Sequence, residues 1–195
     1  MKRKIFISIN LPNRTKKRLV KATEAWQPAQ TGPDRPEPAQ PGDLPVKWNK
    51  EENLHITLLF LGFVDDDSTY AVCEKVAKIS ENSEIFDIEF DSIGLGPTAE
   101  DARMVWVSGQ ANEELRSLVE KIEKELGIFT SSKKEFRPHI TLGKIRKNKW
   151  DELAEKPEIK KDFPLVVSVE SVDVMASNFE GDGMEYTIIE SCELN

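Results

Sequence analysis

The chain contains two histidines, and both lie in the same tetrapeptide, His-Ile-Thr-Leu. The first copy spans 55–58 and the second spans 139–142. Successive side chains of a β-strand point to opposite faces, so each histidine shares a face with the threonine two residues later. The sequence therefore predicts two strands that each present an imidazole beside a hydroxyl, with His55 and Thr57 on one strand and His139 and Thr141 on the other.

If these strands face each other across a cleft, the cleft holds two titratable imidazoles and two hydroxyl donors. The reference pKa of imidazole is about 6.5, so either ring can accept or deliver a proton near neutral pH. Hydrolysis of a phosphodiester needs one proton removed from the attacking water and one delivered to the departing alkoxide. Hydroxyl groups can donate hydrogen bonds to the nonbridging oxygens as their charge grows. The pattern indicates a phosphate-handling site.

Simpler and competing explanations exist for each motif. A single His-x-Thr fits a histidine bound to a neighbouring carbonyl and a threonine favoured by its β propensity. Two copies that use every histidine of the chain favour a shared function instead. A zinc site would need a third ligand, and Cys73 and Cys192 have no metal-ligand spacing. We therefore expect neither a metal ion nor another cofactor.

Composition limits the class of protein. The chain has 195 residues, a charged content of 32% and a formal net charge of −8. Bulk affinity for nucleic acid comes from clustered Lys and Arg, so an acidic chain must meet such a substrate through a local basic rim. No segment approaches membrane-spanning length. We interpret the two cysteines as free thiols, which suits a reducing compartment. We expect a monomeric cytoplasmic protein that does not bind a membrane.

The elements that position the motifs follow from hydrophobic periodicity. We expect strands over 4–10, 46–48, 55–64, 85–93, 104–107, 139–145, 163–176 and 184–192. We expect helices over 16–26, 65–79, 112–126 and 150–155, with Tyr70 on the apolar side of the second, and turns at 94–97 and 181–183. This mixture favours an α+β fold of two related lobes, one for each histidine strand.

A proline-rich stretch, 27–45, interrupts the pattern with almost no large apolar residue. We interpret it as a loop inside a single domain that spans 1–195. Such a loop is either a tolerated surface insertion or a lid over the cleft.

The stretches 53–62 and 136–142, which contain the paired motifs, resemble those of the two-histidine phosphoesterase superfamily. Within that superfamily the chain is most similar to the RNA 2′,3′-cyclic phosphodiesterases, formerly called 2′-5′ RNA ligases. The opening stretch 5–12 and the stretch 46–48 are also similar, whereas 148–164 matches least. The resemblance covers almost the whole chain.

The resemblance implies a bilobal α+β fold, with two antiparallel-sheet lobes and outer helices around a central cleft. It also implies metal-independent hydrolysis of a 2′,3′-cyclic phosphate, on RNA 3′ ends or nucleotides, to a 2′-phosphomonoester. Carried over, His55 would protonate the leaving 3′ oxygen and His139 would activate water. Thr57 and Thr141 would bind the phosphate.

Two further residues are candidate phosphate ligands, Arg137 and Lys144. The family often has an arginine where this chain has Lys144, which keeps the charge but loses the bidentate fork. Arg137 precedes the second motif and can supply positive charge nearby.

Other functions remain open from the sequence. One is a nucleotide-binding module of the same fold without turnover, although binding alone does not need two proton carriers. Another is a phosphodiesterase or ligase acting on 2′-5′-linked oligonucleotides, or on a small cyclic phosphate. The residues alone do not decide the substrate or which histidine is the acid.

Overall fold

The computed structural model describes residues 2–27, 45–128, 136–180 and 183–195. Its strands are β1 (Lys2–Asn10), β2 (Val46–Trp48), β3 (His55–Asp65), β4 (Phe86–Gly96), β5 (Met104–Gly109), β6 (His139–Ile145), β7 (Lys161–Val169), β8 (Ser171–Glu180) and β9 (Gly183–Glu193). Its helices are α1 (Asn13–Thr23), α2 (Asp66–Ser80), α3 (Glu113–Leu126) and α4 (Lys147–Asp151), with 3-10 helices η1 (Glu24–Trp26) and η2 (Glu51–Asn53). The predicted α+β fold class is confirmed.

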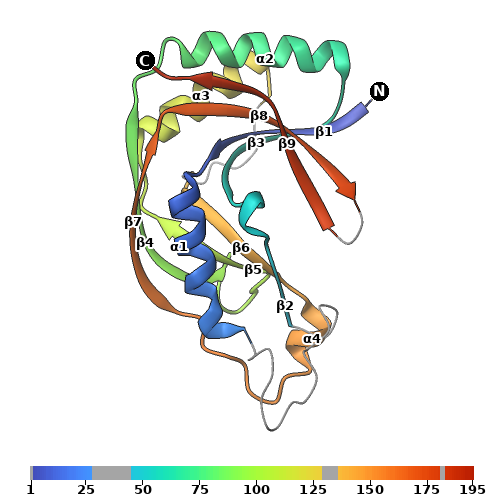
Figure 1. Ribbon diagram of the computed structural model, residues 1–195, viewed down its shortest axis with the longest axis vertical. Helices are drawn as coiled ribbons and strands as arrows, with labels where there is room; N and C mark the ends of the chain where they lie inside the picture. Colours follow the sequence, from blue (N-terminus) through green and yellow to red (C-terminus); the bar gives the residue numbers. More distant parts are fainter. Residues whose placement is uncertain (1, 28–44, 129–135, 181–182) are drawn as a thin grey trace.

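In the described residues, nine strands form one antiparallel sheet in the order β7-β4-β5-β6-β3-β1-β8-β9, with β2 paired to β6. The junction between β6 and β3 divides the sheet into two lobes, so each histidine strand belongs to its own lobe. In Figure 1, α2 and α3 lie along the lobe formed by β1, β3, β8 and β9, whereas α1 lies beside the lobe that contains β4, β5 and β6. The two lobes meet where the two motifs meet.

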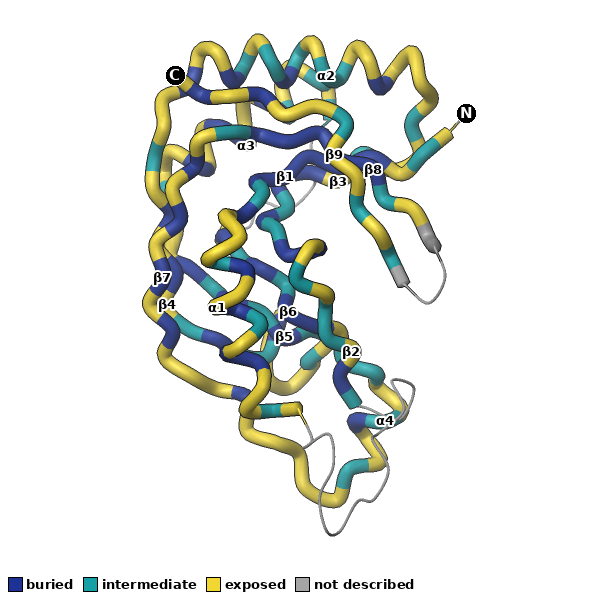
Figure 2. The backbone as a smooth tube through the Cα atoms, viewed as in Figure 1, coloured by how far each residue is buried: buried dark blue, intermediate teal, exposed yellow. Residues whose placement is uncertain are grey.

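The core lies between the sheet and its helices, and Figure 2 shows that buried positions are concentrated along the strands. Ile5, Ile7 and Ile9 form one buried face of β1, as alternation predicts. The helix predicted over 112–126 is also confirmed. It begins after Asn112, whose side chain accepts a hydrogen bond from the Leu115 amide, and ends at a left-handed Gly127.

The single strand expected over 163–176 is wrong, because the chain forms two strands there. β7 ends at Val169 and pairs with β4, whereas β8 begins at Ser171 and pairs with β1. Strand-like residues continue through 170, so periodicity gave no sign of the break. The long-range pairing partners decide it.

Other boundaries also differ from the predictions. The turn expected at 94–97 is part of β4 as far as Gly96, which pairs with Met104. Tyr70 is 68% exposed rather than on the apolar side of α2, and the short helix α4 begins earlier than 150. Residues 28–44 of the predicted loop and 181–182 of the predicted turn lie outside the described residues.

Both cysteines are free, as predicted, although only Cys192 is buried and Cys73 is half-buried. Burial raises the pKa of the Cys192 thiol to about 11. Among the helices of the described ranges, not one has the length and apolar character needed to cross a bilayer.

Gly96 provides a test of the packing beneath the second motif. A Cβ atom at this position would lie 2.0 Å from the ring of Trp106, whereas a Cβ at Gly94 would meet no atom within 4 Å. We expect Gly96→Ala to lower the free energy of unfolding by about 1–3 kcal/mol, because the indole must move in a packed site. Urea denaturation measures this loss, and Gly94→Ala is the matched control. Equal losses in the two variants would contradict the proposed overlap.

Candidate active site

The two histidine motifs are neighbours in the sheet. Ile56 of β3 pairs with Ile140 of β6 in antiparallel register, and both isoleucines are fully buried. The residues on either side of each isoleucine therefore point to the opposite face of the sheet. The structure thus brings all four predicted His and Thr residues onto one face.

The antiparallel register also decides how these four residues are ordered. Continuing from the central pair, His55 lies across from Thr141 and Thr57 lies across from His139. All four are half-buried, and the pattern of burial is identical in the two strands over all seven residues of β6. The repeat expected from the tetrapeptides is therefore a repeat of local structure.

Both ring nitrogens of His55 take part in hydrogen bonds. Nδ1 lies 2.8 Å from the carbonyl oxygen of Asn53, and Nε2 lies 3.0 Å from Oγ1 of Thr57. A carbonyl only accepts, so Nδ1 carries the hydrogen that is donated to it. In neutral His55 the bare nitrogen is therefore Nε2, directed to the threonine.

His139 repeats this arrangement. Its Nδ1 lies 3.2 Å from the carbonyl oxygen of Arg137, which is again two residues earlier in the chain. The ring packs against Trp106 of β5, with centroids 4.7 Å apart. When neutral, both imidazoles therefore carry their hydrogen on Nδ1, which leaves Nε2 as the nitrogen that can accept a proton.

Aromatic rings surround His55. Phe6 of β1 and Tyr186 of β9 each have a ring centroid 5.1 Å from that of His55. Burial lowers the pKa of His55 below its ordinary value, and the positive charge of Lys16 lowers it further. The hydrogen bond to the Asn53 carbonyl acts in the opposite direction but is the smaller effect. The neutral imidazole is therefore favoured in the free protein.

Lys16 is a buried cation beside the site that sequence reasoning missed. Its Nζ donates to the carbonyl oxygen of Glu52 at 3.1 Å, one residue before the carbonyl that binds His55. Burial lowers the pKa of Lys16, and the nearby carboxylate of Asp173 opposes this shift. The side chain of Asn53 donates to the carbonyl of Met184 at 2.7 Å, so η2 is held from both α1 and β9.

Asp173 completes this cluster from β8. It is 1% exposed, accepts a hydrogen bond from Oγ of Ser191 at 2.6 Å, and has its pKa raised by burial. The sequence does not identify these residues as neighbours. Lys16 resembles any lysine on a polar helix, and Asp173 of an apolar strand has no indicated partner. Lys16 is buried where α1 contacts η2, and its charge interacts with Asp173 of β8.

The two candidate phosphate ligands differ in what the structure supports. Lys144 is exposed and pairs with Met104, while Thr141 pairs with Trp106 across a register shift. The shift turns the side chain of Lys144 to the face that carries His139 and Thr141. Arg137 is exposed, and its backbone carbonyl, rather than its guanidinium, is the group seen to contact His139.

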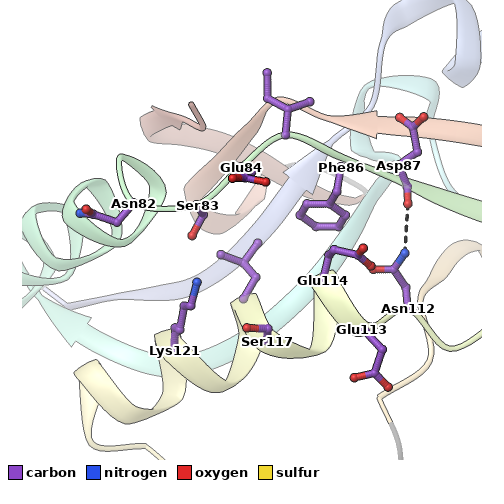
Figure 3. A pocket seen from close by; sticks show the side chains of 12 residues that line it. Asn82, Ser83, Glu84, Phe86, Asp87, Asn112, Glu113, Glu114, Ser117 and Lys121 are labelled. Atoms are coloured by element: carbon purple, nitrogen blue, oxygen red, sulfur yellow. Dashed lines mark hydrogen bonds between the residues drawn. The ribbon is translucent and has the colours of Figure 1, made fainter.

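A second hollow lies away from the histidines, between the start of β4 and the first turns of α3 (Figure 3). Its charged lining is mainly acidic, with Glu84, Asp87, Glu113 and Glu114 against Lys121. That charge is unsuited to a phosphate. Within the ranges that the structure describes, no three His, Cys, Asp or Glu residues come together as a metal site.

The charge of Lys16 provides a test of the site's electrostatics. Because a neighbouring cation disfavours the imidazolium, Lys16→Met should raise the pKa of His55, as measured by NMR titration of the imidazole. Lys17→Met, on the exposed side of α1, is the matched control and should leave it unchanged. Since Lys16→Met leaves Asp173 buried without its cation, a Lys16→Met/Asp173→Asn variant should show the same direction. A lowered or unaltered pKa in both variants would contradict the assignment.

Comparison with known proteins identifies relatives over much of the chain. The sequence profile of the 2′-5′ RNA ligase superfamily matches residues 19–178. An RNA 2′,3′-cyclic phosphodiesterase of Thermotoga maritima is 28% identical over 149 residues, which are 75% of this chain and 78% of that protein. One of Aeropyrum pernix is 38% identical over 107 residues, 53% of this chain and 59% of that protein.

Solved structures show the same fold. The protein TT0787 of Thermus thermophilus has a TM-score of 0.71 at 23% identity, covering 98% of this chain and 97% of that one. E. coli LigT complexed with 3′-AMP has a TM-score of 0.69 at 23% identity, covering 100% of this chain and 99% of that one. The profile match, which includes both motifs, shows that this chain belongs to the 2′-5′ RNA ligase superfamily of two-histidine phosphoesterases.

Proposed function

We propose that the chain hydrolyses 2′,3′-cyclic phosphates at RNA 3′ ends or on nucleotides, giving a 2′-phosphomonoester. The observation that carries the proposal is the matched pair of imidazoles, each bound through Nδ1 to a carbonyl and flanked by a threonine on one face. The names of the sequence relatives, RNA 2′,3′-cyclic phosphodiesterases, support the substrate class.

The two imidazoles account for both proton transfers. His139 takes a proton from water through Nε2 as the water oxygen bonds to phosphorus. His55 gives its Nε2 proton to the 3′ oxygen as the bond between that oxygen and phosphorus breaks. One water is consumed and the 2′ ester bond remains, so general acid–base catalysis is sufficient and no metal ion is needed.

The threonines stabilise the negative charge that develops on the nonbridging oxygens of the phosphate. When Nε2 of His55 is protonated it can donate to Oγ1 of Thr57, which frees the threonine hydrogen for a nonbridging oxygen. Thr141 acts in the same way from β6. Lys144, on the same face, adds positive charge in a chain whose net charge is −8. We propose likewise that the guanidinium of Arg137 contacts the phosphate.

The division of roles between the histidines agrees with their surroundings. A lowered pKa makes protonated His55 a stronger acid, and the charge of a bound phosphodiester favours its protonation. His139 contacts Trp106 through its ring and the Arg137 carbonyl through Nδ1, which leaves Nε2 to meet the attacking water.

The proposal predicts turnover that persists in chelator. Purified protein with EDTA should convert adenosine 2′,3′-cyclic phosphate to the 2′-monophosphate, with a bell-shaped dependence of rate on pH. His55→Ala or His139→Ala should lower kcat by about 10²–10⁴-fold, and the double variant by much less than the product. Thr57→Ala and Thr141→Ala should lose about 10–10³-fold. Activity that EDTA removes and zinc or magnesium restores would refute the mechanism.

A sulfur-substituted substrate can identify the acid. A 2′,3′-cyclic phosphate with sulfur in place of the leaving 3′ oxygen needs little protonation of its leaving group. If His55 is the acid, this substrate should restore most of the rate of His55→Ala and little of that of His139→Ala. The opposite result would exchange the two roles.

The same variants separate the proposal from its alternatives. A binding module would lose nucleotide affinity in the histidine variants and have no rate to lose. An enzyme for 2′-5′ linkages would cleave or join 2′-5′-linked oligonucleotides faster than it opens the cyclic phosphate.

A further inference from the structure

Two exposed phenylalanines continue along β3 from the candidate site. Phe60 is 73% exposed and Phe63 is 67% exposed. In the register between β1 and β3, Phe60 pairs with Phe6 and Phe63 pairs with Lys4. The ammonium of Lys4 lies 5.3 Å from the centroid of the Phe63 ring. We call Lys4, Phe60 and Phe63 the aromatic strip.

The aromatic strip lies on the face that carries His55. Directly paired residues of an antiparallel sheet share a face. Phe6 and Ser8 of β1 share a face and pair with Phe60 and Thr57, because a register shift between them adds one residue to β3. The strip therefore lies on the face of His55 and Thr57. The centroid of the Phe6 ring is 6.0 Å from that of Phe60 and 5.1 Å from that of His55. The strip is therefore continuous with the candidate site through a single ring.

The helices leave this part of the face uncovered. α2 packs against β1, β3, β8 and β9 from the opposite side, where Ile5 and Ile7 are buried. At the other end of the face, the start of α1 brings Lys16 near Asp173. The large exposures of Phe60 and Phe63 show that no described part of the chain packs over them.

The two repeats show what differs at this position. Phe60 and Lys144 are each the fifth residue after the histidine of their motif, and both are the first exposed residues after matching burial patterns. One copy therefore presents an aromatic ring beside the site and the other presents a cation. A ring suits the face of a nucleic-acid base, and a cation suits a phosphate.

The charge of this face also differs from that of the chain. The net charge of the chain is −8. Across β1, β3, β8 and β9, the described residues paired in line between Phe63 and Thr57 include one carboxylate on this face, that of Asp173. That carboxylate is 1% exposed. Lys4 is exposed at the far end of the strip. The accessible surface of the strip is thus aromatic with a cation. The next carboxylate along β3, that of Asp65, pairs with Lys2 and caps α2.

We propose that the aromatic strip is a stacking platform for the RNA nucleotides that precede the cyclic phosphate, so that the chain prefers RNA 3′ ends to free cyclic nucleotides. This inference rests on the proposed hydrolysis at His55 and His139. The partners of His55, Phe60 and Phe63 on β1 are Asn10, Phe6 and Lys4. A strand rises about 3.3 Å per residue, so Phe60 lies roughly 13 Å and Phe63 roughly 20 Å along β1 from His55. A bound mononucleotide leaves Phe63 uncovered, whereas an oligonucleotide extends to it.

The test compares two substrates in the same variants. We measure kcat/KM for a short single-stranded RNA with a 2′,3′-cyclic end and for adenosine 2′,3′-cyclic phosphate. Phe60→Leu and Phe63→Leu keep apolar bulk but remove the ring, and each should lower the ratio of the two values by about tenfold. Phe63→Tyr keeps the ring and should preserve the ratio. Tyr70→Leu, an exposed aromatic on α2, is the matched control.

Binding measurements distinguish failure of this inference from failure of the proposed function. Fluorescence anisotropy gives the affinity for the same RNA ending in a 2′-phosphate, which needs no turnover. If the wild type hydrolyses neither substrate, the proposed function fails, and weaker RNA binding in the leucine variants would still support the platform. Unchanged ratios and affinities would overturn it. If light scattering shows a dimer for the wild type and a monomer for the leucine variants, and RNA binding is unchanged, the platform is also overturned. The strip would then be a contact between copies of the chain.

Discussion

The antiparallel pairing of β3 with β6 at Ile56 and Ile140 is the contact on which the site depends. Because both isoleucines are buried, hydrophobic packing fixes which way the neighbouring side chains point. A slip of one residue in either strand would turn its histidine into the core. The same apolar contact that joins the two lobes therefore also aligns the two imidazoles.

Local backbone geometry then gives the two histidines a common form. Each Nδ1 contacts the carbonyl two residues earlier, at 2.8 Å for His55 and 3.2 Å for His139. This contact belongs to the entry of the chain into the strand, so it recurs wherever the motif recurs. It turns Nε2 of both rings to the shared face, which is what a pair of proton carriers requires.

Their surroundings make the two histidines unequal. His55 lies among Phe6 and Tyr186 with buried Lys16 nearby, whereas His139 lies against Trp106. Burial and the neighbouring cation lower the pKa of His55. Two copies of one tetrapeptide can thus take different roles, because packing from non-repeated elements gives each a different electrostatic environment.

The sequence by itself determined the elements that depend on local pattern. Alternation identified β6 at its observed bounds, and the capping residues Asn112 and Gly127 marked the ends of α3. The shared face of the His and Thr residues within each motif was also predictable, since a spacing of two residues fixes it in a strand. Family membership followed from the same residues and is confirmed by the profile match.

Only the tertiary structure decided what depends on partners distant in the chain. Periodicity could not divide 163–176 into β7 and β8, because both halves are strand-like and only their neighbours differ. The burial of Lys16 beside Asp173 and the exposure of Phe60 likewise depend on which helix covers which part of the sheet. Local preferences specify strands and their faces, whereas long-range packing selects which of those faces is buried and which meets a substrate.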